Sequence, residues 1–442
     1  MLKKIAIVLT MLVVSMFYFP INFTFLPGPN TKNIMGAVGL VVCVALLLGK
    51  RSMSIPKSLL AVLFGASLVS IIGLFSVVYN RTPDMSYATY VVSAIIWLSG
   101  ALAVTSLIKW LHGRLDISLV TQYLVAVCIY QCVAALLIDH FPAVRSIVDS
   151  LISQGQGLLQ AMDRLYGIGA SLDVAGSRFS AVLILLGGEM AKARNDERFA
   201  DLSKQFASYL LIVFVGSMIA RTTYVGAVLG LLTMILMAWR PSLTIKKSTL
   251  KYAFGILMLM AIFVLIGVEM YNSNPRFKEL IRFAFEGFFN LFENGEWSIA
   301  SNEKLETMYV WPDNAKTWII GDAYFNNPRG DINYLGDSTD QGFYMGTDVG
   351  WCRFIFYFGI VGLTAFSAYL TLCCKFAADK LPESRLVVWI VLLANFVVWF
   401  KVSTDLFPMM AILYCLGEFQ PYCSDPEEEE EEDDYLTDSP IL

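Results

Sequence analysis

The sequence predicts an all-α polytopic membrane protein, with about 12 transmembrane helices and a large extracytoplasmic loop subdomain between helices 9 and 10. Of the 442 residues, 57% are hydrophobic and only 16% are charged, and the mean hydropathy is +0.61. A soluble core of this chain length cannot hide so many apolar side chains, so lipid must solvate part of the surface. The apolar runs are continuous over about 17 to 22 residues, which favours helices over the alternating pattern of a β-barrel.

Twelve apolar segments account for the expected helices. The first follows Lys3 and Lys4 and has no small-residue cleavage site before Pro20, so we expect an uncleaved first helix rather than a signal peptide. More spans follow it along the chain. The twelve expected spans are residues 5–19, 34–49, 58–79, 88–108, 117–138, 179–191, 206–220, 224–239, 250–270, 351–373, 386–399 and 406–417.

The basic residues are divided unevenly between the two sides of these spans. If the chain begins in the cytoplasm, the even-numbered connections carry most of its lysines and arginines. The short outer connections hold only Lys32, Arg81, Arg221 and Lys401. This bias follows the positive-inside rule, so we expect a multi-pass protein whose two termini are both cytoplasmic.

Two outer segments, residues 139–178 and 272–350, are too long to be simple connections. The second is rich in tryptophan, tyrosine, glycine and proline, so we expect a folded subdomain there. Its beginning, residues 276–292, has one apolar helical face, which suits a helix in the membrane interface or a helix packed on the rest of the loop. Both loops belong to a transmembrane domain that we assign to residues 1–420.

The chain ends in an acidic segment. The last eighteen residues hold ten acidic side chains and no basic one, and they lack apolar periodicity. We therefore expect residues 421–442 to form a disordered, acidic cytoplasmic tail, for which one alternative role is docking a basic partner.

Cysteine and histidine usage argues against a metal site. The eight cysteines lie mostly within expected spans and show no repeated CxxC spacing, and the only histidines are His112 and His140. Neither a disulfide framework nor a metal centre is indicated, and a mechanism that needs several imidazoles is excluded. We expect no cofactor.

Arginines gather at the expected outer ends of the helices. Their planar guanidinium groups bind phosphate oxygens through two hydrogen bonds and stay charged when partly desolvated. We interpret them as candidate ligands of a diphosphate whose lipid tail lies in the bilayer, with Arg178 and Arg221 in the most apolar context. The alternative is that each one snorkels or meets lipid phosphates non-specifically. The candidates are Arg164, Arg178, Arg221, Arg276, Arg282 and Arg353.

Acidic residues of the second long loop could orient or deprotonate an acceptor hydroxyl group. Asp348 is the most distinctive, because it precedes an apolar helix and lies close in sequence to Arg353. Helix capping or an ion pair is its simpler alternative. Asp322 and Glu306 are the other acids that we select as catalytic candidates, and Asp313, Asp331, Asp337 and Asp340 remain open.

Several short motifs, in order along the chain, resemble the bacterial O-antigen polymerase and O-antigen ligase superfamily. The resemblance covers most of the chain after about residue 160. Its motifs are residues 176–180 (GSRFS), 218–226 (MIARTTYVG), 319–325 (IIGDAYF), 347–353 (TDVGWCR) and 357–362 (YFGIVG).

This resemblance implies a metal-independent glycosyltransferase of the bacterial inner membrane. Members of the superfamily use undecaprenyl-diphosphate-linked glycans at the outer face of that membrane, both as donor and as acceptor in the polymerases. It also implies that Arg178, Arg221 and either Arg276 or Arg282 hold the diphosphate. A chain-length regulator and a flippase are candidate protein partners, the lipid bilayer is the surrounding medium, and no nucleic acid is involved.

The sequence departs from the ligase pattern in one respect. Ligases carry a histidine in the large loop, whereas residues 272–350 contain none. We therefore expect a polymerase of O-antigen, capsule or exopolysaccharide repeat units, with a ligase as the first alternative. A flippase for lipid-linked sugars is the second alternative, against which count the single large loop and the absence of internal repeats. The general base stays unassigned among the acids.

Overall fold

A computed structural model describes residues 2–48, 56–155, 157, 159, 164–238, 247–328 and 342–419. Within these residues the protein is all-helical, with 78% helix and no strands. Six helices are long and apolar enough to cross a membrane. The prediction of a helical membrane protein is confirmed at this level, and the count of twelve spans stays a prediction. The acidic tail, Asp331, Asp337 and Asp340 lie outside the described residues.

Every expected span coincides with a helix. The six described helices that are long and apolar enough to cross a membrane are α3 (Lys57–Asn80), α4 (Tyr90–His112), α5 (Ile117–His140), α8 (Leu172–Asn195), α9 (Phe199–Ile219) and α16 (Gly350–Lys380). The others are α1 (Leu2–Tyr18), α2 (Thr31–Leu48), α10 (Thr223–Ala238), α11 (Lys247–Ser273), α17 (Arg385–Val398) and α18 (Phe407–Phe419).

Helix α8 lies inside the bundle and is longer than its apolar run suggests. It contacts α5, α9, α10 and α17, and 94% of its most apolar stretch is buried inside the protein. The expected span stopped before the charged residue Lys192, but this residue has protein partners. Glu189, for example, accepts a hydrogen bond of 2.6 Å from Ser118 and lies 3.4 Å from Lys192. Buried charges of this kind persist in apolar surroundings only when they are paired.

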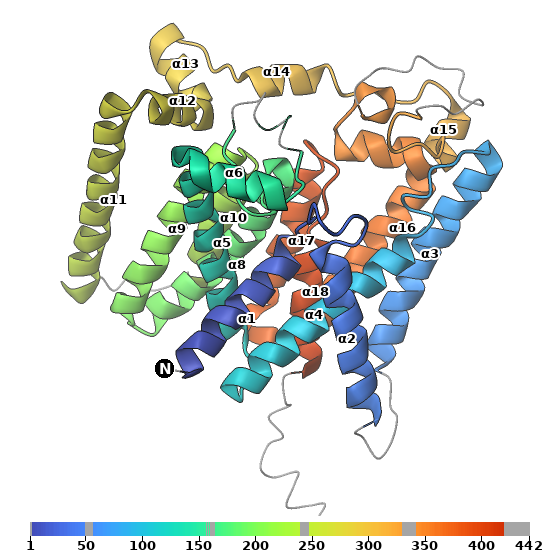
Figure 1. Ribbon diagram of the computed structural model, residues 1–442, viewed down its shortest axis with the longest axis horizontal. Helices are drawn as coiled ribbons and strands as arrows, with labels where there is room; N and C mark the ends of the chain where they lie inside the picture. Colours follow the sequence, from blue (N-terminus) through green and yellow to red (C-terminus); the bar gives the residue numbers. More distant parts are fainter. Residues whose placement is uncertain are drawn as a thin grey trace, which may run out of the picture.

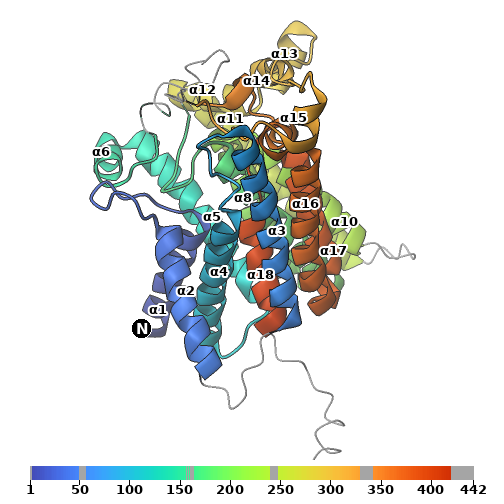
Figure 2. The same ribbon diagram turned by 90° about the vertical axis from the view of Figure 1, so that its right-hand side faces the viewer.

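One end of the bundle is capped by short helices, at the top in Figures 1 and 2. The N-terminus of α1 lies toward the opposite end. The capping helices are α6 (Pro142–Leu151), α12 (Pro275–Ala284), α13 (Glu286–Asn294), α14 (Ala300–Glu306) and α15 (Ala315–Ile320). Two single turns of 3-10 helix also occur, η1 (Tyr344–Gly346) and η2 (Pro382–Ser384).

The expected apolar helix over residues 276–292 is two helices, because the backbone leaves helical geometry at Phe285. In α12 the apolar side chains are buried as expected, and the helix packs against α9 and α11. After the break the single apolar face is lost. Phe288 and Phe292 are 50% and 85% exposed.

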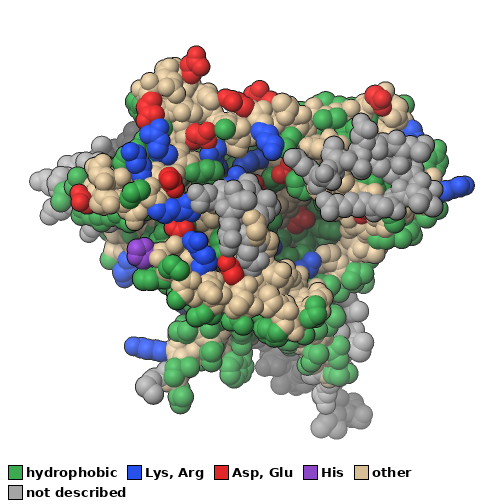
Figure 3. All heavy atoms as spheres, turned by 45° about the horizontal axis from the view of Figure 1, so that its top comes forward, with side chains coloured by type: hydrophobic (Ala, Val, Ile, Leu, Met, Phe, Trp, Pro, Cys, Tyr) green, Lys and Arg blue, Asp and Glu red, His purple; other side chains and the backbone are tan. Residues whose placement is uncertain are grey.

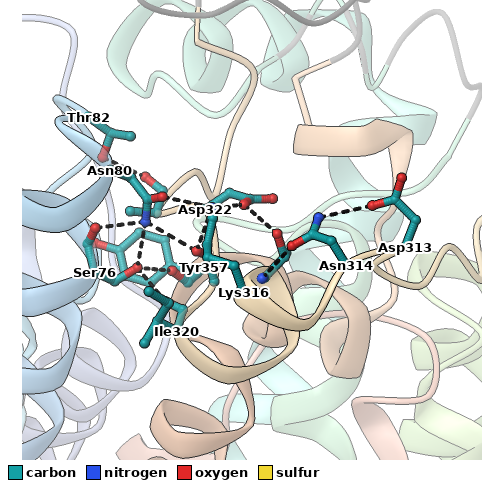
Figure 4. Close-up of polar contacts among 12 residues, drawn as sticks. Ser76, Asn80, Thr82, Asp313, Asn314, Lys316, Ile320, Asp322 and Tyr357 are labelled. Atoms are coloured by element: carbon teal, nitrogen blue, oxygen red, sulfur yellow. Dashed lines mark hydrogen bonds and ion pairs between the residues drawn. The ribbon is translucent and has the colours of Figure 1, made fainter.

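Helix α16 is kinked at Phe358 and Gly359, and the loop after α15 bonds to the backbone beside the kink. Figure 4 shows Asp322 of this loop near Tyr357. The carbonyl groups of Phe356 and Tyr357, which the kink frees, accept the N–H groups of Asp322 and Ala323 at 2.6 and 3.0 Å. Gly359 adopts a φ of 66°, a conformation that glycine allows without strain. The motifs at residues 319–325 and 357–362 are thus the two halves of one contact.

Candidate functional site

The capped end of the bundle is hollowed at its centre, and lysine, arginine and acidic side chains surround the hollow (Figure 3). The charged groups come from segments that are distant in sequence. The arginines, lysine and acids described below come from the segment before α8, the first turns of α8, the α9–α10 turn, the α12–α14 segment, the start of α16 and the α17–α18 turn.

Three of the six candidate arginines line one cavity of about 460 Å³. These residues are Arg164, Arg221 and Arg282, and the remaining walls come mainly from α13 and the start of α14. The cavity is lined by Arg164, Arg221, Arg282, Phe283, Glu286, Phe289, Asn290, Ala300 and Ser301. We call it the arginine cavity.

Arg221 fixes the α12–α14 segment to the transmembrane bundle. It lies in the turn between α9 and α10, and its Nε donates a hydrogen bond of 2.9 Å to the carbonyl of Phe283. One Nη donates to the hydroxyl of Ser301 at 2.8 Å, and the other forms an ion pair with Glu286. Its guanidinium group also lies over the Phe283 ring, 4.1 Å from the centroid. These contacts hold the Arg221 side chain in place at the edge of the cavity.

Arg164 and Arg282 differ in how their charges are compensated. Arg282 bonds both carboxylate oxygens of Glu293, at 2.8 and 2.6 Å, which raises the pKa of its guanidinium group. Arg164 rests on the Phe283 ring at 5.0 Å, and no carboxylate in the described chain is within ion-pair distance. Burial lowers the pKa of Arg164, and Arg221 adds to this effect while Asp173 opposes it. An arginine still stays protonated, so its charge is available to an anion.

Arg178 belongs to a second cationic group. Helix α8 is fixed here by the Ser180 hydroxyl, which donates to the Thr222 carbonyl at 2.8 Å and accepts the Gly226 N–H at 3.0 Å. These contacts join the motifs at residues 176–180 and 218–226. They hold α8 against the α9–α10 turn and so set the position of Arg178.

The guanidinium group of Arg178 packs between aromatic rings and forms no ion pair with a described carboxylate. It is 8% exposed and lies 5.8 and 5.7 Å from the ring centroids of Phe19 and Trp97. Its buried Nε meets no hydrogen-bond acceptor among the described residues. Lys32 lies over the same Trp97 ring at 4.7 Å. Burial raises the pKa of Asp405, whereas the Phe407 N–H and the charges of Lys32 and Arg178 oppose the shift.

Asp348 lies beside Arg353, at 3.8 Å between Oδ1 and Nη1. Burial raises the pKa of Asp348 to about 6, although Arg353 opposes this effect; the charge of Asp173 adds to the rise, and Lys401 opposes it. A carboxyl group with a pKa near neutrality can accept and return a proton under physiological conditions. Among the described candidate acids, Asp348 is the one whose pKa burial raises toward neutrality.

Arg353 is held by the protein itself. It is 5% exposed and donates to Ser403 at 2.7 Å and to the carbonyl of Phe325 at 2.7 Å. Its guanidinium group also lies 3.6 Å from the centroid of the Phe325 ring. These contacts give Arg353 a positioning role, because they tie the loop after α15 to the α17–α18 turn.

The remaining candidates lie apart from the arginine cavity. Arg276 pairs with Asp139 at 3.0 Å, at the end of α5. Asp322 accepts hydrogen bonds from Lys316 at 2.6 Å and Thr317 at 2.7 Å, within the contact drawn in Figure 4. Glu306 is exposed at the end of α14. The structure therefore separates the predicted set instead of gathering it at one point.

Two residues that the sequence analysis did not select connect the groups. Asp173, in the first turn of α8, lies 3.0 Å from Lys401 and accepts a hydrogen bond from Thr222. Its charge acts on both Arg164 and Asp348. The available sequence signals were an acidic residue five positions before Arg178 and a single lysine in the short connection between the last two apolar segments.

Among the described residues, no three histidine, cysteine or acidic side chains are grouped as metal ligands would be. No family model, no curated protein and no solved structure matches the chain. The function is therefore inferred from the chemistry of the side chains at the capped end.

Proposed function

We propose that this protein is a metal-independent glycosyltransferase that polymerises undecaprenyl-diphosphate-linked oligosaccharide repeat units at the outer face of a bacterial inner membrane. The observation that carries the proposal is the arginine cavity, where Arg164, Arg221 and Arg282 meet at one end of the apolar helices. Guanidinium groups suit phosphate oxygens in geometry and in charge, and this position would keep the lipid of such a substrate in the bilayer.

Two separate cationic groups suit a reaction with two lipid diphosphates. The arginine cavity and the Arg178 group share no lining residue that the structure describes. A polymerase must hold a donor and an acceptor at once, each carrying its own diphosphate. Each cationic group would then bind one diphosphate, and the two glycans would meet at the capped end.

The chemistry is a displacement at the anomeric carbon of the donor. The acceptor hydroxyl oxygen forms the new glycosidic bond, and the bond from the anomeric carbon to the diphosphate oxygen breaks. The leaving lipid diphosphate takes the electron pair, and arginines stabilise the charge that develops on it. Asp348 accepts the proton of the acceptor hydroxyl. The charge of Asp173 acts both on Arg164, a proposed diphosphate ligand, and on Asp348, the proposed base.

The glycan ladder of a deletion strain tests this proposal. Loss of a polymerase should leave single repeat units on the cell surface, whereas loss of a ligase or flippase should leave none. Wild-type protein should restore the long ladder, and Arg164→Ala should leave single repeats at matched membrane expression. Arg145→Ala is the control, because Arg145 pairs with Asp139 and does not line the arginine cavity.

The outcome for the Arg164 variant decides the head-group assignment. A full ladder with Arg164→Ala would mean that this guanidinium group binds no diphosphate, and the proposed site would be wrong. A surface without any glycan in the deletion strain would exclude the polymerase itself.

A further inference from the structure

The arginine cavity adjoins an apolar groove of about 530 Å³. The groove lies between α9 and α11 and is closed by the ends of α12 and α13, with Phe214, Val264 and Phe285 among its walls. Phe289 lines both the groove and the arginine cavity. A polar space lined by arginines and an apolar one therefore lie next to each other, with Phe289 as a wall that they share.

The junction between the two spaces is amphipathic. Tyr271 stacks on Phe289, with ring centroids 5.8 Å apart and an interplanar angle of 10°. Its hydroxyl group meets Nη1 of Arg282 at 3.3 Å, so its ring faces the groove while its polar end contacts a cavity arginine. Arg282 in turn lies 4.9 Å from the Phe289 centroid. A ligand that crosses the junction meets charge on one side and hydrocarbon on the other.

The groove is space that the protein leaves open between two helices. Helix α11 stands at the side of the bundle (Figure 1), and its main contacts are with α9 and α12. A Cβ atom placed on Gly267 would find only the Phe214 ring, at 3.9 Å. Helices that pack on each other normally fill such space with side chains. In a membrane, an apolar groove of this kind is filled by hydrocarbon.

We infer that this groove binds the isoprenoid chain of a lipid diphosphate whose phosphates occupy the arginine cavity. The inference rests on the proposed function and names the part of the protein that recognises the lipid. The chain leaves the head group at Phe289 and runs between α9 and α11 into the bilayer. Recognition of the hydrocarbon should make binding depend on chain length, because a longer chain makes more packing contacts with the groove walls.

Two glycines of α11 provide a matched pair of variants. Gly267 lines the groove, and a leucine side chain there would occupy the space meant for the lipid. Gly255 is on the same helix, has open space around its Cβ position and does not line the groove. Gly267→Leu and Gly255→Leu therefore make the same change in helix propensity and hydrophobicity at different places.

The experiment measures binding to the purified full-length protein in nanodiscs. The probes are inorganic diphosphate, geranyl diphosphate and undecaprenyl diphosphate, with dioleoylphosphatidylglycerol as a competitor. We expect undecaprenyl diphosphate to bind more tightly than geranyl diphosphate. Gly267→Leu should weaken undecaprenyl diphosphate binding about tenfold or more, since the chain loses its buried contacts. Gly267→Leu should leave the affinity for inorganic diphosphate unchanged. Gly255→Leu should bind all three probes as the wild-type protein does.

Each contrary outcome has a separate meaning. Equal affinity for the short and long chains, or no effect of Gly267→Leu, would overturn the groove while leaving the diphosphate site and the proposed function intact. Competition by the phospholipid at equal strength would show a general lipid groove and would also overturn the inference. If inorganic diphosphate itself fails to bind, the proposed function fails, and the lipid site fails with it.

Discussion

The arginines predicted as diphosphate ligands differ in what surrounds their guanidinium groups. Arg276, Arg282 and Arg353 are each paired with carboxylates, whereas Arg164 and Arg178 have mainly aromatic neighbours. The sequence predicted that these arginines lie at the ends of apolar helices, and the prediction that this end is the outer one stays a prediction. It could not predict which would be paired, because the partners are far away along the chain, as with Asp139 and Arg276.

Buried arginines with and without partners should respond differently to replacement by methionine. Arg178→Met removes a buried cation that lacks a carboxylate, so we expect the free energy of unfolding to rise by roughly 1 kcal/mol. Arg353→Met, by contrast, leaves the Phe325 carbonyl and Asp348 without their partner and should cost roughly 3 kcal/mol. Thermal unfolding in detergent measures both changes.

If Arg178 serves ligand binding, the stabilised Arg178→Met protein should also fail to extend glycans. Destabilisation by Arg178→Met would instead show that the arginine contributes to the fold. Retained activity would show that it binds no substrate.

The raised pKa of Asp348 predicts a pH dependence. A base works only when deprotonated, and the deprotonated fraction of Asp348 grows as the pH rises through about 6. Polymerisation should therefore fall by about tenfold per pH unit on the acidic side and level off above neutrality. Asp348→Asn should abolish most activity and remove this limb from the remaining rate. A wild-type profile that is flat between pH 5 and 7, about one unit either side of that pKa, would exclude Asp348 as the base.

At the scale of secondary-structure elements, hydrophobicity predicted where the long helices lie. It did not predict where helices are broken or kinked. Every expected span coincides with a helix, since continuous apolar runs are the strongest signal in the chain. The break at Phe285 and the kink at Gly359 come from tertiary contacts. Apolar periodicity continues through both, so the pattern gives no sign of them.

The contact between α15 and the α16 kink should be sensitive to one methyl group. A Cβ atom on Gly359 would lie 2.1 Å from the carbonyl oxygen of Ile319, and the position also has positive φ. Gly359→Ala should therefore destabilise the protein by roughly 2–4 kcal/mol and expose the α15 loop to protease. Gly295 also has positive φ, but nothing lies within 4 Å of its Cβ position. Gly295→Ala should cost only about 1 kcal/mol. Equal losses for the two variants would mean that strain alone, without the close contact, sets the cost.

At the scale of the whole molecule, composition and charge bias predicted a helical membrane protein with a large outer segment. The six long apolar helices agree with the first part of this prediction. The division of the arginines into two groups could not be predicted, because it depends on how α8, α9 and α10 pack beside α12. In the proposed function, this division would provide one cationic group for each of two lipid diphosphates.

Reconstituted polymerisation tests the central claim most directly. Purified full-length protein in liposomes would receive undecaprenyl-diphosphate-linked repeat units in the presence of a metal chelator, and the length of the lipid-linked glycan would be measured. We expect wild type and Arg145→Ala to join repeat units, and Arg164→Ala to leave them single. The claim is contradicted if the wild-type protein joins no units, or if Arg164→Ala joins them at the wild-type rate.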